Sequence, residues 1–338
     1  MLGRARLHTA FGEPGEPFVR LTRSGLTIAV SVTVLGSLVA IFLVWKGQRA
    51  YDPAFDTKVA NPTYKTGGPV VLYDEGHLNT HSASGAYKPL AGLIRSDGYE
   101  LRVSRQVFSL QALAGVSVLI VALARGANDA NDNPAFTESE IATIDQWVRN
   151  GGSLLLVTDH WPYGPAAAAL AQRFDVQMGK GLVEDPVQHD PSRGDSHLVF
   201  SEDNGLLRDH PIVHGRAPAE RVRKVLTFTG QSLLGPRSAV PFLALSDTAV
   251  ELPPTVPKVE KSGGDVRVSM EYGAPVSAKG KAQGIALEVE RGRVVVLGEA
   301  GMLRAQRERG GERVGMNVPG YDDRQLAINI MHWLSRNL

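Results

Sequence analysis

The sequence predicts an α/β protein built on a doubly wound, mostly parallel sheet. Three short apolar runs support this prediction: Pro69–Tyr73, Ser153–Thr158 and Arg293–Leu297. Their Val and Leu residues follow one another without polar alternation, as in strands that helices bury on both faces. Helical patterns separate the runs, and strands that alternate with helices form parallel sheets through right-handed crossovers.

The elements that follow the first run fit this alternation. A helix is expected over Tyr87–Ser96 and a second strand over Tyr99–Ser104. Ser109–Ala114 is interpreted as a short helix before a third buried strand, Val116–Ala122. These lengths are typical of successive βα units.

The most clearly marked helix begins at Thr137. Thr137 can cap it, and Glu140 stands three residues further on, as a capping box requires. Four apolar residues recur at helical spacing: Ile141, Ile144, Trp147 and Val148. Two glycines end this helix before the strand Ser153–Thr158, and an Ala-rich helix follows over Pro165–Phe174.

Residues 179–283 interrupt the alternation and are rich in Gly, Pro and charge. We interpret them as a β-rich elaboration of the same domain, with Leu252–Gly264 as an exposed loop. The candidate strands here are Val222–Thr229, Val240–Leu245 and Val266–Tyr272. The α/β pattern returns with Ile285–Val289, Arg293–Leu297 and a final helix over Gln325–Leu334.

The N-terminal part contains an uncharged apolar run, Leu26–Trp45. At ~1.5 Å per residue it spans about 30 Å, enough to cross a bilayer. A cleaved signal peptide is the alternative, but the run exceeds the usual ~7–15 apolar residues and no small-residue cleavage site follows; a buried core helix is a further alternative. We expect a tail (1–25), a transmembrane helix (26–45), a linker (46–68) and the α/β domain (69–338).

The orientation in the membrane follows from the short N-terminal tail. Basic residues flank the apolar run on both sides, so the positive-inside signal is weak. A short tail before a large domain usually stays in the cytoplasm. We therefore expect a single-pass protein of the cell membrane with its soluble domain on the extracytoplasmic side.

Composition excludes several function classes. With 36 basic and 35 acidic residues, the chain has no bulk charge that would favour nucleic acid as a partner. The absence of cysteine excludes disulfides, thiolate metal ligands and a cysteine nucleophile. Dinucleotide-binding, P-loop and serine-hydrolase motifs are missing, so no cofactor is assigned.

Polar residues cluster where three of the expected strands end. In a parallel sheet these carboxyl ends lie at one edge, where ligands bind. The side chains are therefore expected to line a single crevice, as acid–base groups or ligands. The candidate catalytic residues are Asp74, Glu75, His77, Asp159, His160 and Glu299.

A divalent metal is a further possibility at this edge. Its candidate ligands are His77, His81 and Asp159, because imidazole and carboxylate groups are typical donors. The alternative is structural: polar residues after a strand often cap the next helix or hydrogen-bond within a loop.

Several segments together resemble the class I glutamine amidotransferase-like superfamily, which has a flavodoxin-like fold. They are YDEGHLNTHSASGAYKPL, FTESEIATIDQWVRNGGSLLLVTDHWPYGPAAAALAQRF, LRDHPIV, KVLTFTG, GRVVVLGEAGMLRAQ, GMNVPG and LAINIMHWL. The resemblance runs from Pro69 to the C-terminus and is greatest to uncharacterised bacterial members. It implies a nucleophilic cysteine at the elbow that Asp159 and His160 occupy here, so glutaminase activity by that route is excluded.

Two functions remain open. One is a membrane-anchored, hydrolase-like enzyme, metal-assisted or not, that uses the strand-end residues. The other is a non-catalytic domain that binds a small molecule or a protein, or serves as a scaffold in a membrane-associated complex. The resemblance allows the second, because superfamily members occur in gliding and ciliary transport machinery. Geometry discriminates them: an enzyme requires its reactive groups to converge.

Overall fold

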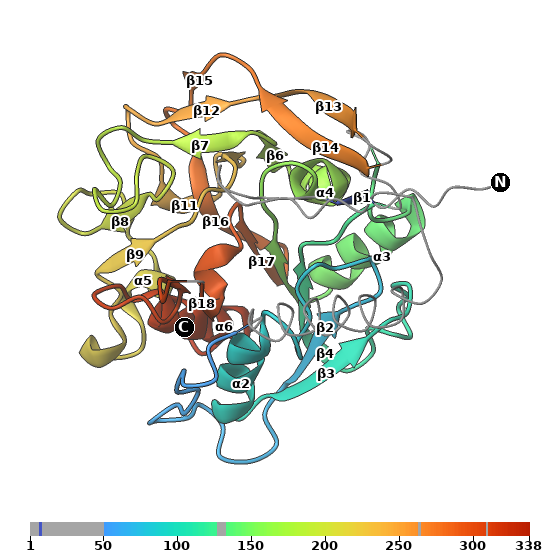
Figure 1. The fold of residues 1–338 in the computed structure, drawn as a ribbon. Coiled ribbons are helices and arrows are strands. Elements are labelled where there is room, and N and C mark those ends of the chain that lie inside the picture. Colours follow the sequence, from blue (N-terminus) through green and yellow to red (C-terminus); the bar gives the residue numbers. More distant parts are fainter. Residues whose placement is uncertain (1–6, 9–50, 127–132, 263–264, 309) are drawn as a thin grey trace, which may run out of the picture. The chain divides into compact units, whose positions relative to one another are not determined.

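The computed structural model describes residues 7–8, 51–126, 133–262, 265–308 and 310–338 (Figure 1). The chain divides into two compact units, which are described separately. One comprises residues 1–49 with Thr255–Glu271, and the other comprises Ala50–Pro254 with Tyr272–Leu338.

The smaller unit contains a three-stranded sheet. β1 (Leu7–His8) pairs in parallel with β14 (Asp265–Tyr272), which lies between β1 and β13 (Pro254–Ser262). The strand expected over Val266–Tyr272 is confirmed, but the loop expected over Leu252–Gly264 is wrong. Its prolines indicated a loop, yet an edge strand such as β13 tolerates proline because one side of it makes no ladder hydrogen bonds.

The larger unit is built on a nine-stranded sheet whose core is parallel. β2 (Val70–Asp74) pairs with β3 (Glu100–Ser104) and β4 (Val116–Ala122), β4 pairs with β5 (Ser153–Val157), and β5 pairs with β17 (Gly292–Leu297). All four pairings are parallel, as expected. The order β3-β2-β4-β5-β17 is the 2-1-3-4-5 order of flavodoxin-like sheets, with its switch point between β2 and β4.

The sheet continues with antiparallel strands beyond β17. β16 (Ala282–Val289) forms a hairpin with β17 and also pairs with β10 (Leu233–Leu234) and β11 (Val240–Ala244). β6 (Gln177–Met178) pairs with β10. The expected elaboration therefore contributes strands to the main sheet itself.

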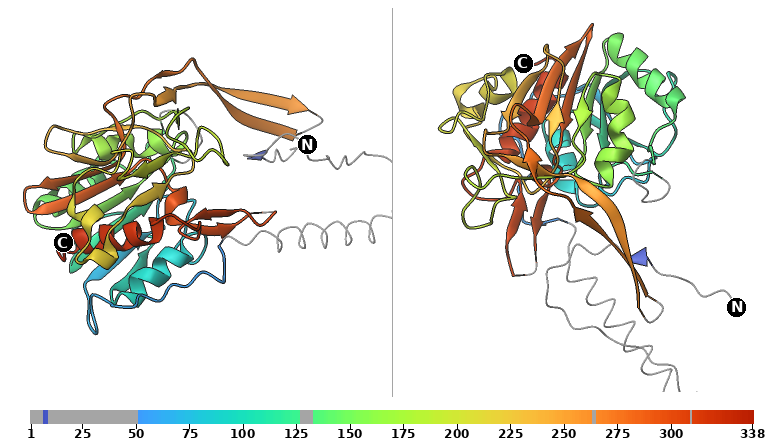
Figure 2. Two further views of the ribbon diagram at one scale, coloured as in Figure 1. Left: turned by 90° about the vertical axis from the view of Figure 1, so that its left-hand side faces the viewer. Right: turned by 90° about the horizontal axis from the view of Figure 1, so that it is seen from above.

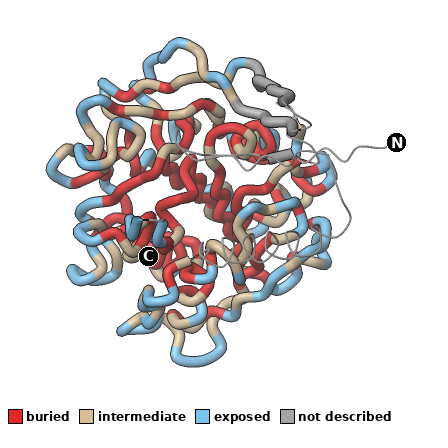
Figure 3. The backbone as a smooth tube through the Cα atoms, viewed as in Figure 1, coloured by how far each residue is buried: buried red, intermediate tan, exposed pale blue. Residues whose placement is uncertain are grey.

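Helices cover both faces of the sheet (Figures 1 and 2). α2 (Lys88–Ser96) and α6 (Asp323–Leu334) pack on one face, and α3 (Glu138–Arg149) and α4 (Tyr163–Gln172) pack on the other. Side chains of β5 alternate between the two cores, and every residue of that strand is buried. Figure 3 shows these central strands as the buried interior of the molecule.

Local signals explain where the helices begin. Thr137 caps α3: its hydroxyl accepts from the Glu140 N–H, and the Glu140 carboxylate accepts from the Thr137 N–H. The expected capping box is therefore confirmed. The helix expected over Ser109–Ala114 is wrong, because this segment forms hydrogen-bonded turns. Six residues are too few to offset the cost of helix nucleation without strong packing.

The remaining elements are short and lie between or beside these layers. β7 (Leu182–Glu184), β12 (Val250–Leu252) and β15 (Val276–Ser277) form a small sheet; β8 (Val199–Ser201) pairs with β9 (Lys224–Leu226), and β18 (Ala305–Arg307) pairs with β19 (Arg313–Gly315). The short helices are α5 (Pro211–His214), η1 (Pro218–Glu220) and η2 (Gly301–Leu303).

The described part of the expected linker, residues 51–68, is held against the larger unit. Its first anchor is Asp52, whose N–H donates to the Ala305 carbonyl at 2.6 Å. The Asp52 carboxylate accepts from Arg307 Nε at 2.9 Å and from Asn317 Nδ2 at 3.1 Å. The segment therefore docks beside β18 instead of acting as a free tether there.

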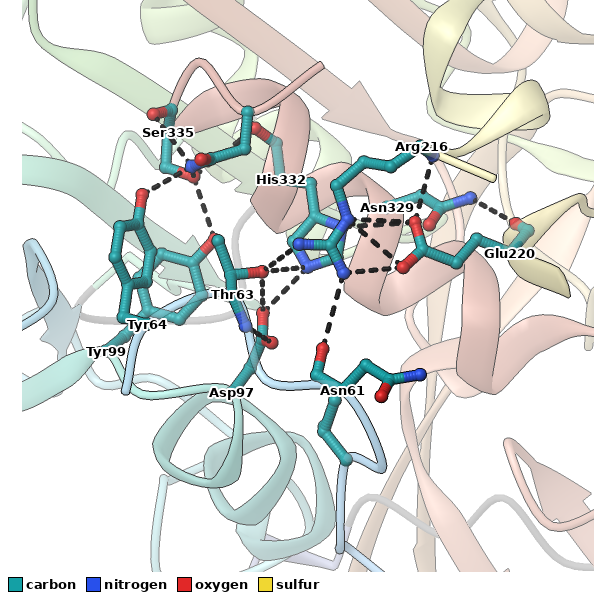
Figure 4. Close-up of polar contacts among 12 residues, drawn as sticks. Asn61, Thr63, Tyr64, Asp97, Tyr99, Arg216, Glu220, Asn329, His332 and Ser335 are labelled. Carbon is teal, nitrogen blue, oxygen red and sulfur yellow. Dashed lines mark hydrogen bonds and ion pairs between the residues drawn. The ribbon is translucent and has the colours of Figure 1, made fainter. Parts of the chain in front are cut away.

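A second anchor lies at Thr63, shown in Figure 4. The Thr63 N–H donates to Asp97 Oδ1 at 2.7 Å, and its hydroxyl lies 2.8 Å from His332 Nε2. Arg216 donates to the same hydroxyl at 2.7 Å while it pairs with Glu220. These contacts join the segment to the ends of α2 and α6.

The expected transmembrane helix, 26–45, lies outside the described residues. Among the residues that are described, no helix combines the length and apolar character that a bilayer crossing requires.

Candidate functional site

The first strand-end cluster forms at the switch point of the sheet. Asp74 ends β2, and His77 lies in the loop that follows. His77 Nδ1 is 2.9 Å from Asp74 Oδ1, and His77 Nε2 is 2.9 Å from Glu140 Oε1 on α3. All three side chains are buried. We call Asp74, His77 and Glu140 the Asp74 cluster.

The Asp74 cluster has its charges and hydrogen bonds satisfied internally. Burial alone would lower the pKa of His77, but the two carboxylates outweigh it and raise that pKa. Burial likewise opposes ionisation of Glu140, yet hydrogen bonds from Thr137, His77 and Phe108 lower its pKa to about 2. An imidazolium between two carboxylates is the stable state, and both ring nitrogens are occupied.

The loop after β2 also bonds to the chain at the end of β4. Asn79 Nδ2 donates to the Ala122 carbonyl at 3.0 Å, and the Thr80 N–H donates to the Leu123 carbonyl at 3.1 Å. Leu78 and Leu123 adopt positive φ values of 51° and 47°, a costly conformation for bulky residues. The loop after β2 is therefore hydrogen-bonded to the carboxyl end of β4, beside the switch point where many such folds bind ligands.

Glu75 is engaged elsewhere in the same loop. One of its oxygens accepts from the Ala83 N–H at 3.0 Å, and the other accepts from Arg105 Nη2 at 2.6 Å. The Arg105 side chain is largely exposed. Glu75 thus fixes the loop locally and belongs to neither strand-end cluster.

The second cluster lies at the ends of the neighbouring strands β5 and β17. Asp159 Oδ1 accepts from the His160 N–H at 2.8 Å, and Asp159 Oδ2 accepts from the Ala300 N–H at 3.3 Å. Glu299 is fully buried and accepts from the N–H groups of Gly301 and Met302. The structure therefore brings Asp159 and Glu299 together, as expected, because Asp159 bonds to the N–H of Ala300, the residue directly after Glu299.

The two carboxyl groups destabilise each other's charge. Burial raises the pKa of Glu299 well above its usual value, and the charge of Asp159 raises it further. Burial also raises the pKa of Asp159, although His160 and the Ala300 N–H oppose this. Such a pair holds a proton that isolated carboxyls would lose, and it titrates as a unit.

His160 completes the expected side of this cluster. Its Nδ1 lies 3.0 Å from the Trp161 carbonyl and 3.2 Å from the Tyr272 hydroxyl, and its Nε2 lies 3.5 Å from Asp159 Oδ1. The ring is held beside the carboxyl pair, and its side chain is 9% exposed.

Arg304 is a residue of this site that the sequence reasoning missed. It follows η2, five positions after Glu299. Its Nε is buried and has no hydrogen-bond partner, and among the described residues no carboxylate forms an ion pair with it. Burial lowers its pKa, opposed by the nearby Tyr87, Glu299 and Asp159. Its short distance in sequence from the strand-end carboxylate Glu299 was the signal that could have identified it as a site residue. We call Asp159, His160, Glu299 and Arg304 the Glu299 cluster.

His81 and Tyr87 connect the first loop to the Glu299 cluster. The Tyr87 hydroxyl donates to the Ala300 carbonyl at 2.8 Å, and the His81 ring lies 4.9 Å from the Tyr87 ring. Burial and the charge of Arg304 lower the pKa of His81 to about 3. His81 is therefore neutral at physiological pH and adds no positive charge.

The proposed metal ligands do not converge. His77 bonds within the Asp74 cluster, whereas His81 and Asp159 lie toward the Glu299 cluster. Across the described residues, no three histidine or acidic side chains are arranged to hold a metal ion. The six candidate residues thus separate into two hydrogen-bonded groups plus Glu75.

Comparison with known proteins yields a similarity of fold. No protein-family profile and no curated protein sequence matches the chain. Among solved structures, the mmIFT52 N-terminal domain superposes with a TM-score of 0.53 at 13% identity, covering 79% of this chain and 97% of that one. A putative ThuA-like protein from Bacteroides uniformis gives a TM-score of 0.38 at 13% identity, with coverages of 84% and 95%. The first likeness shows a shared fold alone.

Proposed function

We propose that the chain is a membrane-tethered domain of the class I glutamine amidotransferase-like type that binds a small anionic molecule without transforming it. The binding site is the Glu299 cluster at the carboxyl edge of β5 and β17. The flavodoxin-like strand order, the helices on both faces and the missing cysteine all support this assignment.

Arg304 is the observation on which the proposal rests. Arg304 as a whole is half-buried, and its Nε is buried without a hydrogen-bond partner. A buried donor that lacks a partner is costly, because its desolvation is not repaid. The two neighbouring carboxyl groups direct their oxygens to backbone N–H groups instead. A ligand carboxylate or phosphate would satisfy Arg304 with charge-assisted hydrogen bonds, and the raised pKa values of Asp159 and Glu299 reduce repulsion of such an anion.

In the two described clusters the reactive groups are engaged in hydrogen bonds or buried, which favours binding over catalysis. His77 uses both ring nitrogens within the Asp74 cluster, and Glu299 is fully buried. Activation of a nucleophile requires a base within hydrogen-bond reach of it. In the two clusters the hydroxyls that meet this condition are those of Thr137, which caps α3, and Tyr272, whose pKa burial raises to about 12. Both properties disfavour their use as nucleophiles.

Titration with inorganic phosphate and with acetate tests this proposal. Arg304→Gln should weaken binding by about 10- to 100-fold, because one charge-assisted contact contributes ~1.5–3 kcal/mol. Arg237→Gln is the matched control, since Arg237 is exposed and distant in sequence from the site. Calorimetry that shows no anion binding, or equal losses in both variants, would overturn it.

A hydrolase-like enzyme is the second candidate. Its support is the pair of carboxyls with raised pKa values beside His160, an arrangement that suits acid–base chemistry. Hydrolysis of 4-nitrophenyl esters or glycosides that Asp159→Asn abolishes and the exposed Arg237→Gln leaves intact would establish this function in place of the first.

The membrane tether is part of the proposal and has its own test. Removal of the residues before Gln48 should convert a membrane-fractionating protein into a soluble, folded one with the domain's native circular dichroism. A soluble full-length protein, or an aggregated shortened one, would contradict the tether. Protease accessibility in intact cells would show whether the domain lies on the extracytoplasmic side.

A further inference from the structure

β3 is an open edge of the main sheet (Figure 1). Among the described strands it pairs with β2 alone. The Glu100 N–H donates to the Pro69 carbonyl at 3.1 Å, and the Ser104 carbonyl accepts from the Glu75 N–H at 2.7 Å. Because peptide groups alternate in direction along a strand, those of Leu101 and Val103 point away from β2.

This edge has only part of the protection usual for exposed strands, which the charged Glu100 and Arg102 supply. β3 is short, but no proline, bulge or covering helix among the described residues blocks its outer peptide groups. Apolar side chains near it are exposed: Val103 by 40%, Val107 by 69% and Leu110 by 50%. An open edge beside exposed apolar groups is a surface for strand addition.

The charges of β3 are complementary to a second copy of the same strand. Glu100 and Arg102 lie on one face and form an ion pair at 2.7 Å, with more than half of each side chain exposed. If two β3 strands pair antiparallel about Leu101, Glu100 of each copy lies opposite Arg102 of the other. These positions do not form cross-strand hydrogen bonds, so their side chains approach most closely.

We propose that two copies of the chain associate through antiparallel β3–β3 pairing centred on Leu101. The N–H and carbonyl groups of Leu101 bond to those of Leu101 in the other copy, and the Val103 N–H donates to the opposite Tyr99 carbonyl, because the Tyr99 N–H already donates to the Ile94 carbonyl. Two Glu100–Arg102 pairs form across the two-fold axis. Pairing centred on Arg102 would place Arg102 opposite itself, and like charges there are destabilising. The interface is isologous, as in most homodimers.

The chain contains no cysteine, so single introduced cysteines report the pairing directly. In the proposed register the two Leu101 Cα atoms lie ~5.5 Å apart, within disulfide range. Two Val103 residues would be separated by about four strand positions, or ~13 Å, which is beyond that range. Leu101→Cys should therefore form a disulfide-linked dimer of the full-length protein under mild oxidation, and Val103→Cys should not.

Charge reversal supplies the second arm of the experiment. In the Leu101→Cys background, Glu100→Arg and Arg102→Glu should each reduce cross-linking by about tenfold, since each places like charges opposite. The double swap E100R/R102E should restore it. Monomeric Leu101→Cys protein, stronger cross-linking of Val103→Cys, or failure of the double swap to restore the dimer would overturn the proposal. None of these results depends on anion binding at Arg304.

Discussion

The Asp74 cluster and the Glu299 cluster both follow strand ends of one sheet, yet their electrostatics are opposite. In the Asp74 cluster a histidine lies between two carboxylates and each charge has a partner. In the Glu299 cluster two carboxyls lie side by side and the nearby Arg304 bonds to neither. The first arrangement satisfies its own charges, and the second is the site at which we propose that an anion binds.

Glu140 and Glu299 make the comparison quantitative. Both are buried glutamates, with 5% and 0% of their surface exposed. The pKa of Glu140 falls to about 2 because hydrogen bonds from Thr137, His77 and Phe108 outweigh burial. The pKa of Glu299 rises because burial is reinforced by Asp159. Because both glutamates are buried, the groups that neighbour them decide whether the pKa rises or falls.

Removal of His77 should produce the largest effect on stability. His77→Ala leaves Asp74 and Glu140 buried without a counter-charge, which typically costs about 3–5 kcal/mol. Urea unfolding at neutral pH measures this loss. His81→Ala is the control from the same loop, because His81 is neutral and contributes a ring contact to Tyr87. Equal losses in both variants would contradict the structural role of the Asp74 cluster.

The Glu299 cluster should make stability fall as pH rises above about 4.5. The unfolded chain loses the proton of Glu299 near pH 4.5, the ordinary pKa of a glutamate, whereas the folded chain retains it. Between these two pKa values the folded state binds more protons, so higher pH favours unfolding, by up to ~1.4 kcal/mol per pH unit for one proton.

The Glu299 cluster changes stability in a different pH range from the residues of the Asp74 cluster. His77 has a raised pKa, so its stabilisation is complete below 6.5 and is lost above that value. The stabilisation from Glu140 is lost only as pH falls below 4.5 toward about 2. Between pH 4.5 and 6.5, neutral His81 makes the unfolding free energy rise with pH and the two carboxyls make it fall. The double variant Asp159→Asn with Glu299→Gln should therefore make the slope of unfolding free energy against pH more positive. An unchanged slope would show that these carboxyls ionise normally.

The sequence predicted the sheet better than it predicted the site. The strands at Val70–Asp74, Val116–Ala122, Ser153–Val157 and Gly292–Leu297 were recognisable because burial on both faces requires continuous apolar runs. Helix α3 was recognisable because its capping box is local in sequence. β13 was missed because edge position, which makes proline tolerable, depends on the partner strand.

The sequence placed the candidate residues at strand ends, but it did not predict their partners or their division into two hydrogen-bonded clusters. Strand ends correctly located Asp159 and Glu299 together. The pairing of His77 with Glu140 spans 63 residues, and Glu140 had already been explained as a capping residue. Arg304 lies beyond a turn whose course is set by Glu299 accepting from the N–H groups of Gly301 and Met302. Such long-range choices of partner leave no periodic signal in the sequence.

Thr137 offers the smallest and most local test of the comparison, because Glu140 serves both the cap of α3 and the Asp74 cluster. Glu140 Oε2 accepts from the Thr137 hydroxyl, and Glu140 Oε1 bonds to His77. Thr137→Ala should cost about 1 kcal/mol, the usual value for a lost N-cap. Thr143→Ala in the same helix is the control, since the exposed Thr143 hydroxyl bonds only to the Ser139 carbonyl and alanine favours helix.

A double-mutant cycle with Thr137→Ala and His77→Ala shows whether the cap and the cluster act together. If Thr137 helps to hold the Glu140 carboxylate toward His77, the two losses in unfolding free energy should sum to more than the loss in the double variant, by at least ~0.5 kcal/mol. Strict additivity would mean that the cap and the ion cluster share Glu140 without coupling, and that the cluster orients this carboxylate by itself. The cycle is measured by urea unfolding near pH 6, where His77 remains protonated because its pKa is raised.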